Sequence, residues 1–387
     1  MADQKRRGQI KQAPENFLSQ DLIADLNENG MDDARRGFLR KGFMAALGGA
    51  VGVGSAANVL AADGDPVILE KQEWQTTLGK NVATMPYGMP SIYEANLIRR
   101  ESPGLTRVSA ASVAFTPLQG LFGIITPNGL HFERQHQGWY NIDPEKHRLM
   151  VNGLVKHNRV FTMNDLMRLP SVSRIHFIEC GANTGLEWGN VAVPTVQYTH
   201  GMLSCCEFTG VPLRTLLEDC GADLKKAKFV LAEGADGSSM TRSIPIELVM
   251  SGEVFVAYGQ NGEMLRPENG YPLRLVVPGV QGVSWVKWLR RIKLGDMPWA
   301  AKDEAVHYVD LMPDGQHRQY TSIQECKSVI TSPSGGQTLL DKGHYNVSGL
   351  AWSGRGKITR VDVSFDGGIN WVEAPLQTPV MSKCLTR

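Results

Sequence analysis

Cys180 is the residue of this chain best placed to do chemistry, because it follows a predicted strand and begins a Gly-Ala-Asn turn. Residues 174–179 alternate polar and apolar side chains, as a half-buried strand does. A cysteine at the end of such a strand can direct its sulfur into a cleft, where a thiolate binds a metal or reacts. The alternative is a small buried apolar side chain, which is the more common role of a single cysteine.

Three further segments are rich in charged, aromatic and glycine residues. They are residues 126–138, 231–245 and 266–292. Taken singly, their charged residues have ordinary interpretations. Arginine and lysine can be exposed strand charges, a histidine can be a surface or core residue, and the aspartate of the glycine-rich segment 231–245 can belong to a turn.

The elements that must position these residues mix strands and short helices without a βαβ repeat. Residues 148–155 predict a strand, and Thr162 with Asp165 forms a capping box that predicts a short helix before Pro170. Residues 212–220 are typical of a helix with proline near its start. The mixture predicts an α+β fold with a mixed sheet rather than a doubly wound fold. Further strands are predicted at residues 228–232, 254–258, 273–277 and 285–294.

The character of the chain changes near residue 321. Residues 345–352 and 357–365 alternate as strands with one exposed face do, and residues 366–368 are typical of a turn. A β-sandwich is therefore predicted, although only 67 residues remain, whereas an immunoglobulin-like sandwich takes about 100. We expect three parts: a signal region at 1–62, a main domain at 63–320 with an irregular arm at 63–120, and an incomplete sandwich at 321–387.

The N-terminal residues are typical of a twin-arginine export signal. Residues 34–41 read ARRGFLRK, and a weakly apolar segment at 43–53 follows that is too short to span a bilayer. Cleavage near Ala62 leaves 32 basic and 32 acidic residues, so the mature chain is close to neutral. We expect a periplasmic protein, exported folded, with no membrane span after processing.

Composition and cysteine spacing exclude several classes of protein. The net charge of +1 is not that of a nucleic-acid or membrane-surface binder, which carries a clustered basic excess. Folding before export favours reduced thiols, so the six cysteines do not predict a disulfide framework. There is no CxxCH segment for covalent haem, and electrons released by any redox reaction must therefore leave to a separate carrier.

Together and in this order, the four segments resemble the sulfite oxidase family of molybdopterin enzymes, most closely its sulfane dehydrogenase (SoxC) branch. The resemblance covers roughly residues 120–375. It implies a mixed-sheet molybdopterin domain at 63–320 and an immunoglobulin-like dimerisation domain at 321–387. The joint occurrence of the segments outweighs the ordinary interpretations of the single residues.

The resemblance also implies the residues of the site. It places the one protein ligand of molybdenum at Cys180, with Arg134 and Trp188 as further catalytic residues. A soft thiolate suits molybdenum, arginine and lysine suit a phosphate, and aspartate and asparagine suit a pterin ring. The implied contacts to molybdenum-molybdopterin are Phe132, Glu133, Arg134, Gln135, His136, Asp236, Asn269, Arg274, Trp285, Val286 and Lys287.

This sequence departs from the family pattern at several pocket positions. Thr184 and Gly185 stand where the oxidases have two arginines, and Ser284 stands where they have a third. Each lost arginine–oxyanion contact would forfeit about 1.5–3 kcal/mol. We therefore expect a substrate other than a small dianion. The active-site tyrosine of the family has no clear counterpart, although Tyr308 or His307 could replace it.

The expected function is oxidation of carrier-bound sulfane sulfur, or of sulfite, by oxygen-atom transfer. The resemblance implies a c-type cytochrome subunit as electron acceptor, a sulfur-carrier protein as substrate bearer, and a homodimer or hetero-oligomer. Alternatives are a sulfite dehydrogenase acting on free sulfite and a methionine-sulfoxide-type reductase, which usually lacks the β-sandwich. A secreted binding module without cofactor is a third, from another class.

Overall fold

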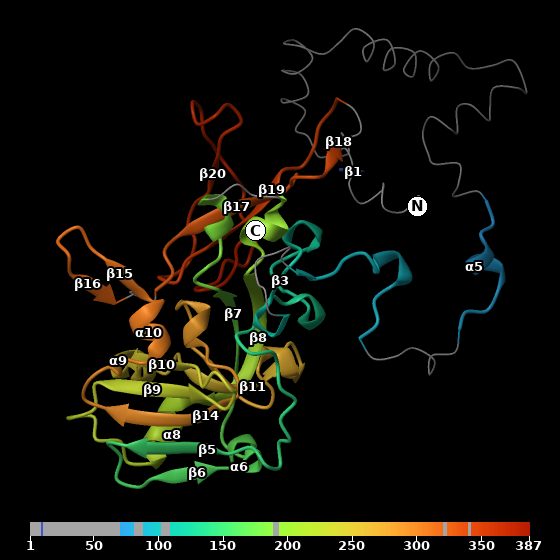
Figure 1. Cartoon of the computed structure of the whole chain (residues 1–387). Helices are drawn as coiled ribbons and strands as arrows, with labels where there is room; N and C mark the ends of the chain where they lie inside the picture. The colour runs from blue at the N-terminus through green and yellow to red at the C-terminus, as the bar shows by residue number, and fades with distance from the viewer. Residues whose placement is uncertain are drawn as a thin grey trace, which may run out of the picture. The chain divides into compact units, whose positions relative to one another are not determined.

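The computed structural model describes residues 9–10, 70–80, 88–101, 109–188, 193–319, 323–339 and 342–387 (Figure 1). The predicted twin-arginine segment lies outside these residues. The chain divides into two units, one of Met1–Ile10, Ile92–Leu339 and Asn346–Arg387, the other of Lys11–Ser91 and Leu340–Tyr345. All the elements that position the site belong to the first unit. The domain boundaries at residues 62 and 320 stay predictions.

One five-stranded sheet of the first unit is mixed. Its strand order is β10-β9-β14-β5-β6, in which β14 pairs with β5 in parallel and the other pairs are antiparallel. A mixed sheet was the prediction, and it is confirmed. The strands are β5 (Leu149–Gly153), β6 (Arg159–Phe161), β9 (Phe229–Gly234), β10 (Thr241–Pro245) and β14 (Leu289–Gly295).

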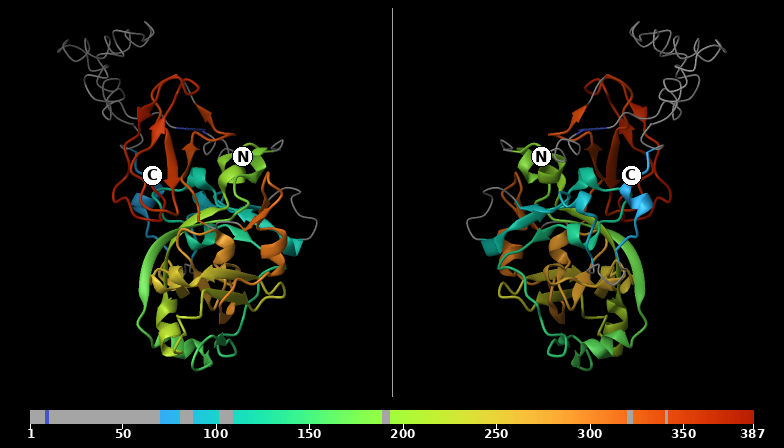
Figure 2. Two further views of the ribbon diagram at one scale, coloured as in Figure 1. Left: turned by 90° about the vertical axis from the view of Figure 1, so that its left-hand side faces the viewer. Right: turned by 90° about the vertical axis from the view of Figure 1, so that its right-hand side faces the viewer.

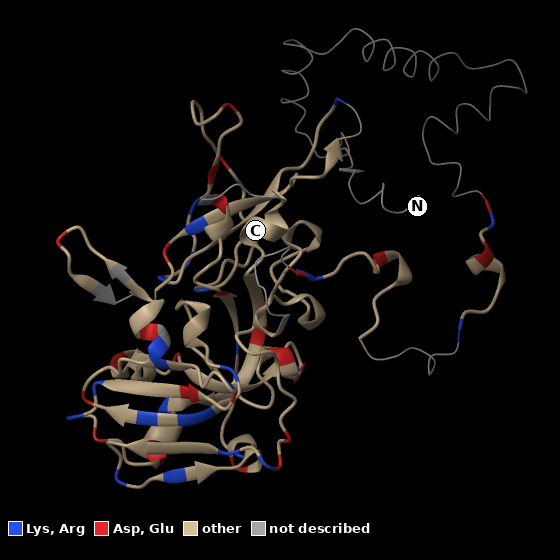
Figure 3. Cartoon of the chain, in the orientation of Figure 1, with Lys and Arg blue, Asp and Glu red and all other residues tan. Residues whose placement is uncertain are grey.

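Charged residues of this sheet pair across neighbouring strands. Arg290 of β14 donates to the carboxylate of Glu233 on β9 at 2.7 Å, and Arg291 bonds the same carboxylate. Figure 3 shows basic and acidic residues interspersed over the sheets. Two of the three cations of β14 therefore share one carboxylate of the neighbouring strand.

A second sheet is antiparallel and carries the predicted Cys180 strand. Its order is β12-β11-β8-β7, with β13 also pairing β11. The long hairpin of β7 and β8 pairs eight successive residues, from Val172 with Gly210 to Glu179 with Leu203 (Figure 2). The strands are β7 (Val172–Glu179), β8 (Leu203–Pro212), β11 (Phe255–Gln260), β12 (Glu263–Met264) and β13 (Arg274–Val276).

Two predicted helices are present with their predicted caps. In α6 (Met163–Met167) the Thr162 side chain accepts from the Asp165 amide at 3.1 Å, and the Asp165 carboxylate accepts from the Thr162 amide at 2.9 Å. α8 (Leu213–Asp219) follows Pro212 and ends before Gly221, whose φ of 66° suits glycine. The remaining helices are α5 (Glu73–Thr76), α7 (Val196–His200), α9 (Ile246–Met250), α10 (Lys302–Val306), η4 (Ile92–Glu94), η5 (Ser109–Ala111), η6 (Leu118–Gly120), η7 (Asn128–Leu130), η8 (Gly185–Trp188), η9 (Pro267–Asn269) and η10 (Gly282–Ser284).

Two strand predictions were wrong in extent. The strand predicted at 285–294 begins only at Leu289, because η10 precedes it and Trp288 adopts a φ of 51°, which no strand residue has. The strand predicted at 357–365 shortens to β20 (Asp362–Val363), which pairs with β21 (Val372–Glu373). The turn predicted at 366–368 is present, with φ of 72° and 91° at its two glycines.

The predicted irregular arm is mostly irregular where it is described, and its end supports the site. β2 (Arg100–Glu101) pairs with β3 (Val113–Phe115), and β3 pairs with β4 (Glu133–Arg134). In β4 the two residues point to opposite faces of this small sheet. Because of that alternation, the side chains of Arg134 and Glu133 have different surroundings.

The C-terminal strands share a small apolar core with the Cys180 hairpin. β17 (Lys327–Ser332) pairs with β19 (Ser348–Trp352) in antiparallel register. Among the described residues, no helix is long and apolar enough to cross a membrane. The shared core holds Leu118, Phe177, Val196, Leu203, Cys205, Leu350, Trp352, Cys384 and Leu385. The other strands are β1 (Gln9–Ile10), β15 (Val309–Leu311), β16 (His317–Gln319) and β18 (Thr338–Leu339).

Candidate active site

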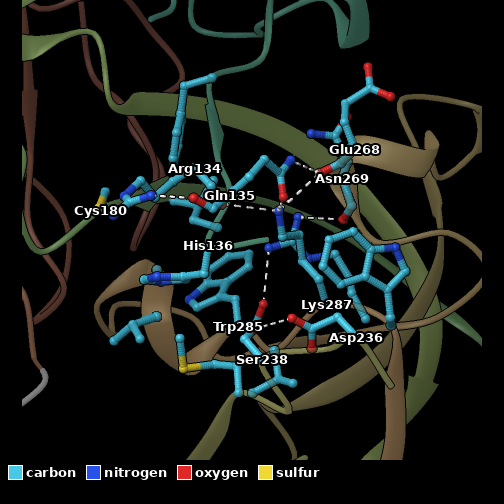
Figure 4. Close-up of a pocket in the computed structure, with 18 of the residues that line it drawn as sticks. Arg134, Gln135, His136, Cys180, Asp236, Ser238, Glu268, Asn269, Trp285 and Lys287 are labelled. Carbon is cyan, nitrogen blue, oxygen red and sulfur yellow. Dashed lines mark hydrogen bonds between the residues drawn. The ribbon is translucent and has the colours of Figure 1, made fainter. Parts of the chain in front are cut away.

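Two neighbouring chambers of a cavity meet at Cys180. Both are lined by Arg134, His136, Cys180 and Tyr308. We call the chamber that continues toward Asp236, Asn269, Arg274 and Lys287 the inner chamber, and the one completed by Gly181, Ala182 and His307 the outer chamber. Figure 4 shows Cys180 at one end of the inner chamber, with Lys287 and Asp236 toward the other.

Backbone hydrogen bonds fix the turn that presents Cys180. The Cys180 amide donates to the Met202 carbonyl at 3.0 Å, and the Asn183 amide donates to the Cys180 carbonyl at 2.9 Å. Burial raises the pKa of the Cys180 thiol, while a backbone hydrogen bond with Ala182 and the charge of Arg134 act in the opposite direction. A bound metal would provide the positive charge that a buried thiolate needs.

Lys287 is a cation of the inner chamber without a carboxylate ion-pair partner among the described residues. Its ammonium donates to Gln135 Oε1 at 2.7 Å and to the carbonyls of Glu268 and Arg134 at 3.1 and 3.2 Å. Burial, and then repulsion by Arg274, lowers the pKa of Lys287 from 10.5 to about 7. Gly270 makes room for this lysine, since a β-carbon there would lie 3.0 Å from Lys287 Cβ at a φ of 110°.

Arg274 is a second cation, only 2% exposed, and it too forms no carboxylate ion pair within the described part of the chain. Its guanidinium donates to the carbonyls of Asn269 and Trp285 at 3.0 and 3.2 Å, and burial lowers the pKa of Arg274 to about 10. Buried charges in proteins are normally paired. Two such cations lining one chamber therefore fit an anionic ligand, as a phosphate group would be.

Besides Arg274 Nε, three buried polar atoms around the same chamber have no hydrogen-bond partner among the described residues. They are Asp236 Oδ1, Asn269 Oδ1 and His131 Nε2. Buried polar groups are nearly always hydrogen-bonded, so these atoms fit a ligand with several donors and acceptors, such as a pterin ring. With the two cations and the thiol, the chamber's donor set matches a phosphate-bearing pterin that carries a metal.

His131 is a chamber residue that sequence reasoning missed. Its Nδ1 lies 2.7 Å from the Phe132 carbonyl and 3.3 Å from Asn269 Nδ2, and its ring stacks on Phe132. Burial, and then the charge of Arg274, lowers the pKa of His131 to about 3, so the ring is neutral. The sequence feature that could have identified His131 as a site residue is its position directly before Phe132 in segment 126–138.

Most of the residues predicted for the site line the inner chamber. Glu133 is the exception among the predicted residues whose side chains the structure describes. The Glu133 carboxylate pairs with Arg99 instead, because Glu133 lies on the opposite face of β4 from Arg134. The side chain of Trp188 lies outside the description, so its role stays a prediction. The lining residues that were predicted are Phe132, Arg134, Gln135, His136, Cys180, Asp236, Asn269, Arg274, Trp285, Val286 and Lys287.

Tyr308 lies where a family tyrosine was sought. It lines both chambers, and its ring packs against the Cys180 turn, since a β-carbon on Gly181 would lie 3.6 Å from Tyr308 Cε1. The guanidinium of Arg242 lies 4.8 Å from the centre of the Tyr308 ring. Arg242 also forms a buried ion pair with Glu304 of α10 at 3.7 Å. Sequence reasoning named Tyr308 and His307 but could not choose between them.

The outer chamber carries little positive charge. Arg134 is the one arginine or lysine among the described residues that line it. Thr184 and Gly185 do not line either chamber, and a β-carbon on Gly185 would have no atom within 4 Å. The described lining of the outer chamber thus holds one arginine and not the cluster of cations that a small dianion would need.

Comparisons with known proteins agree with this arrangement. The family Oxidoreductase molybdopterin binding domain matches residues 136–302, and the family Mo-co oxidoreductase dimerisation domain matches residues 318–384. Mitochondrial sulfite oxidase of Rattus norvegicus is 34% identical over 279 residues, which cover 65% of this chain and 49% of that protein. Nitrate reductase [NADH] of Solanum lycopersicum is 34% identical over 291 residues, 66% of this chain and 32% of that protein. The chain spans about half the length of the sulfite oxidases it matches.

A solved structure is similar over most of both chains. The crystal structure of the sulfane dehydrogenase SoxCD from Paracoccus pantotrophus has 46% sequence identity and a TM-score of 0.79, covering 84% of this chain and 83% of that chain. The fold and the chamber define a molybdopterin-binding oxidoreductase domain followed by a dimerisation domain. The chain belongs to the sulfite oxidase family, and its cofactor is molybdenum-molybdopterin. The predicted family and cofactor are confirmed.

Proposed function

We propose that this protein is a periplasmic oxidoreductase that oxidises reduced sulfur, with a sulfane sulfur borne by a carrier protein as its preferred substrate. One observation carries the proposal: Cys180 lies where two chambers meet. Among the described residues, Lys287 and Arg274 line only the inner chamber and form no carboxylate ion pair, whereas the one arginine or lysine of the outer chamber is Arg134, which both chambers share. The inner chamber suits the cofactor, and the outer chamber suits a sulfur substrate.

The chain's own residues have distinct tasks in this proposal. Lys287 and Arg274 would hold the cofactor phosphate, and Asp236, Asn269 and His131 would bond its ring. When bound, the cofactor supplies oxygen-atom transfer to sulfur and accepts the two electrons released. Water supplies the oxygen atom overall.

In the outer chamber, the residues near the sulfur orient it and exclude solvent. Arg134 would orient the oxyanion that develops on sulfur, since a charge-assisted hydrogen bond is worth about 1.5–3 kcal/mol. Tyr308 lines the chamber beside Gly181 and would help to keep water from the reacting sulfur. Cys180 would hold the metal at the junction of the two chambers.

The weak positive charge of the outer chamber favours a carrier-bound sulfur over a free dianion. A sulfur attached to a cysteine carries less charge than sulfite and needs fewer cations to bind. The likeness to a sulfane dehydrogenase structure supports the same choice. Free sulfite is the second candidate substrate, because the curated relatives include sulfite oxidases.

The partners follow from the chemistry and from the export signal. The two electrons released need an acceptor, for which we propose a c-type cytochrome subunit in the periplasm. The match to the dimerisation domain supports a homodimer or a larger assembly. A methionine-sulfoxide-type reductase is less well supported, because it usually lacks that domain.

Metal and pterin analysis of the wild-type protein beside Cys180→Ser tests the proposal. We expect both proteins to contain molybdenum and pterin, because the phosphate and ring contacts do not involve Cys180. Turnover of a persulfide-loaded carrier protein with cytochrome c is expected to fall by roughly 1,000-fold in the variant, about 4 kcal/mol. Wild-type protein without molybdenum, or with sulfoxide reduction in place of sulfur oxidation, would refute the proposed function.

A further inference from the structure

A buried carboxylate lies directly before Cys180 and receives three side-chain donors. Glu179, the last residue of β7, is 0% exposed. Its Oε1 accepts from Asn183 Nδ2 and from Lys327 Nζ, each at 3.0 Å, and its Oε2 accepts from Trp352 Nε1 at 2.8 Å. Both oxygens of the carboxylate are therefore hydrogen-bonded, although the group is shielded from water.

Two of the three donors come from the C-terminal domain. Lys327 begins β17 and Trp352 ends β19, and the two residues lie directly opposite each other in the register of these strands (Figure 1). The antiparallel pairing therefore delivers both donors to one carboxylate. Trp352 is itself 0% exposed and belongs to the core shared with the β7–β8 hairpin.

A buried carboxylate is stable only when its partners are complete. Removing one member of a buried ion pair leaves an uncompensated charge, which is far more damaging than replacing the pair as a whole. The Glu179 cluster therefore ties the end of β7 to the C-terminal domain in one defined geometry. Exposed ion pairs, such as Arg355 with Glu325 in the same domain, have no such effect.

The third donor connects this cluster to the cysteine turn. Asn183 donates to Glu179, and its Oδ1 accepts from the Met202 amide at 3.1 Å. The Met202 carbonyl in turn accepts from the Cys180 amide at 3.0 Å, and the Cys180 carbonyl accepts from the Asn183 amide. Residues 179, 180, 183 and 202 are thus linked by hydrogen bonds that hold the backbone of Cys180 at both its amide and its carbonyl.

We propose that Glu179, Lys327 and Trp352 form a positioning clamp through which the C-terminal domain sets the orientation of Cys180 in the cavity. The inference rests on the proposed function of Cys180 as the metal ligand. It gives the C-terminal domain a part in the geometry of the active site in addition to a part in dimerisation. None of the three residues lines either chamber, so they act through the turn and not by contact with substrate.

Three variants and one control test the clamp. Lys327→Met leaves the Glu179 charge without its cation, and Glu179→Gln with Lys327→Met removes that charge while keeping one of the two acceptor oxygens that Asn183 and Trp352 use. Trp352→Phe removes one hydrogen bond and is the variant to use if Lys327→Met fails to fold. Arg355→Met is the matched control, because it breaks an exposed ion pair in the same domain.

The first measurement needs no cofactor. Hydrogen–deuterium exchange of the segment 179–188 in the apo-protein is expected to be at least about tenfold faster in Lys327→Met than in wild type. In the double variant the exchange rate of this segment should return to within about threefold of the wild-type rate, and in Arg355→Met it should equal the wild-type rate. Equal protection of the segment in Lys327→Met and wild type would overturn the clamp.

The second measurement uses the loaded enzyme. Lys327→Met is expected to shift the electron paramagnetic resonance signal of pentavalent molybdenum and to lower kcat by roughly 100-fold with KM unchanged, because small displacements of reacting groups have effects of that size. A merely structural role would lower the unfolding midpoint and leave the spectrum as in wild type. That outcome would overturn the clamp. If instead the wild-type protein contains no molybdenum, the proposed function is overturned, and the hydrogen–deuterium exchange measurement still tests the clamp.

Discussion

Lys287 offers the sharpest test of how the chain holds its cofactor. Its ammonium is surrounded by Gln135 Oε1 and two carbonyl oxygens, and no carboxylate pairs with it within the described residues. Lys287→Met removes the charge and nearly keeps the length of the side chain. If Lys287 binds the phosphate of the cofactor, the variant should lose affinity for that group specifically.

The size of the loss can be worked from the structure. Burial lowers the pKa of Lys287 from 10.5 to about 7. Keeping the ammonium protonated in this place therefore costs about 5 kcal/mol relative to water. A phosphate beside it offsets that penalty, and the resulting charge-assisted hydrogen bond contributes about 1.5–3 kcal/mol of affinity. Because 1.4 kcal/mol is a factor of ten, Lys287→Met should weaken cofactor binding by roughly 10- to 100-fold.

The assay is reconstitution of apo-protein with a titration of free cofactor. Bound pterin is measured by fluorescence after oxidative release, and molybdenum by mass spectrometry. Lys228→Met is the matched control, because Lys228 is exposed and lies next to β9, away from both chambers. If Lys287→Met folds normally and binds the cofactor with the affinity of the wild type, the assignment of Lys287 to the phosphate is refuted.

Three further predictions concern pH, substrate and stability. The native pKa of Lys287 lies below that of the unfolded chain, so the unfolded state binds more protons between about pH 7 and 10.5. The unfolding free energy of the wild-type apo-protein should therefore rise with pH by up to about 1.4 kcal/mol per pH unit relative to that of Lys287→Met. Denaturant titrations in which the two unfolding free energies change in parallel with pH would contradict this. Gly185→Arg should raise kcat/KM for free sulfite by roughly tenfold, because a long side chain has free space at Gly185 and would extend a guanidinium toward the outer chamber, which Gly185 itself does not line; an unchanged or lower value would count against the substrate assignment. Arg242→Gln should lower the unfolding free energy by about 3–5 kcal/mol, because it leaves Glu304 buried without its ion pair; Arg242→Lys should recover part of that loss, and chemical denaturation measures both.

Local signals in the sequence predicted the local structure well. The capping box at Thr162 and Asp165 predicts α6 because both of its hydrogen bonds are made within one turn of the helix. The alternation of residues 174–179 predicts the strand that forms the end of β7, although the structure buries Phe177, Ile178 and Glu179 in succession, so both faces are covered there and not one. These patterns depend on neighbours only a few residues away.

Features that depend on distant contacts were not predictable in this way. The strand expected from residue 285 starts late because Trp288 takes a left-handed conformation and Lys287 packs on Gly270. Glu133 and Arg134 look equally suited to the site, and only the pairing of β4 with β3 decides which one faces the cavity. No sequence pattern shows that Lys327 meets Glu179, which lies 148 residues away.

The inner chamber is assembled from segments that lie far apart in the chain, from His131 to Lys287. A ligand that bridges all of them acts as a non-covalent cross-link, because the segments cannot separate while it is bound. Binding to the native state alone stabilises it by about 2.7 kcal/mol at a ligand concentration 100 times the dissociation constant. Loading should therefore make the protein markedly more resistant to proteolysis and heat.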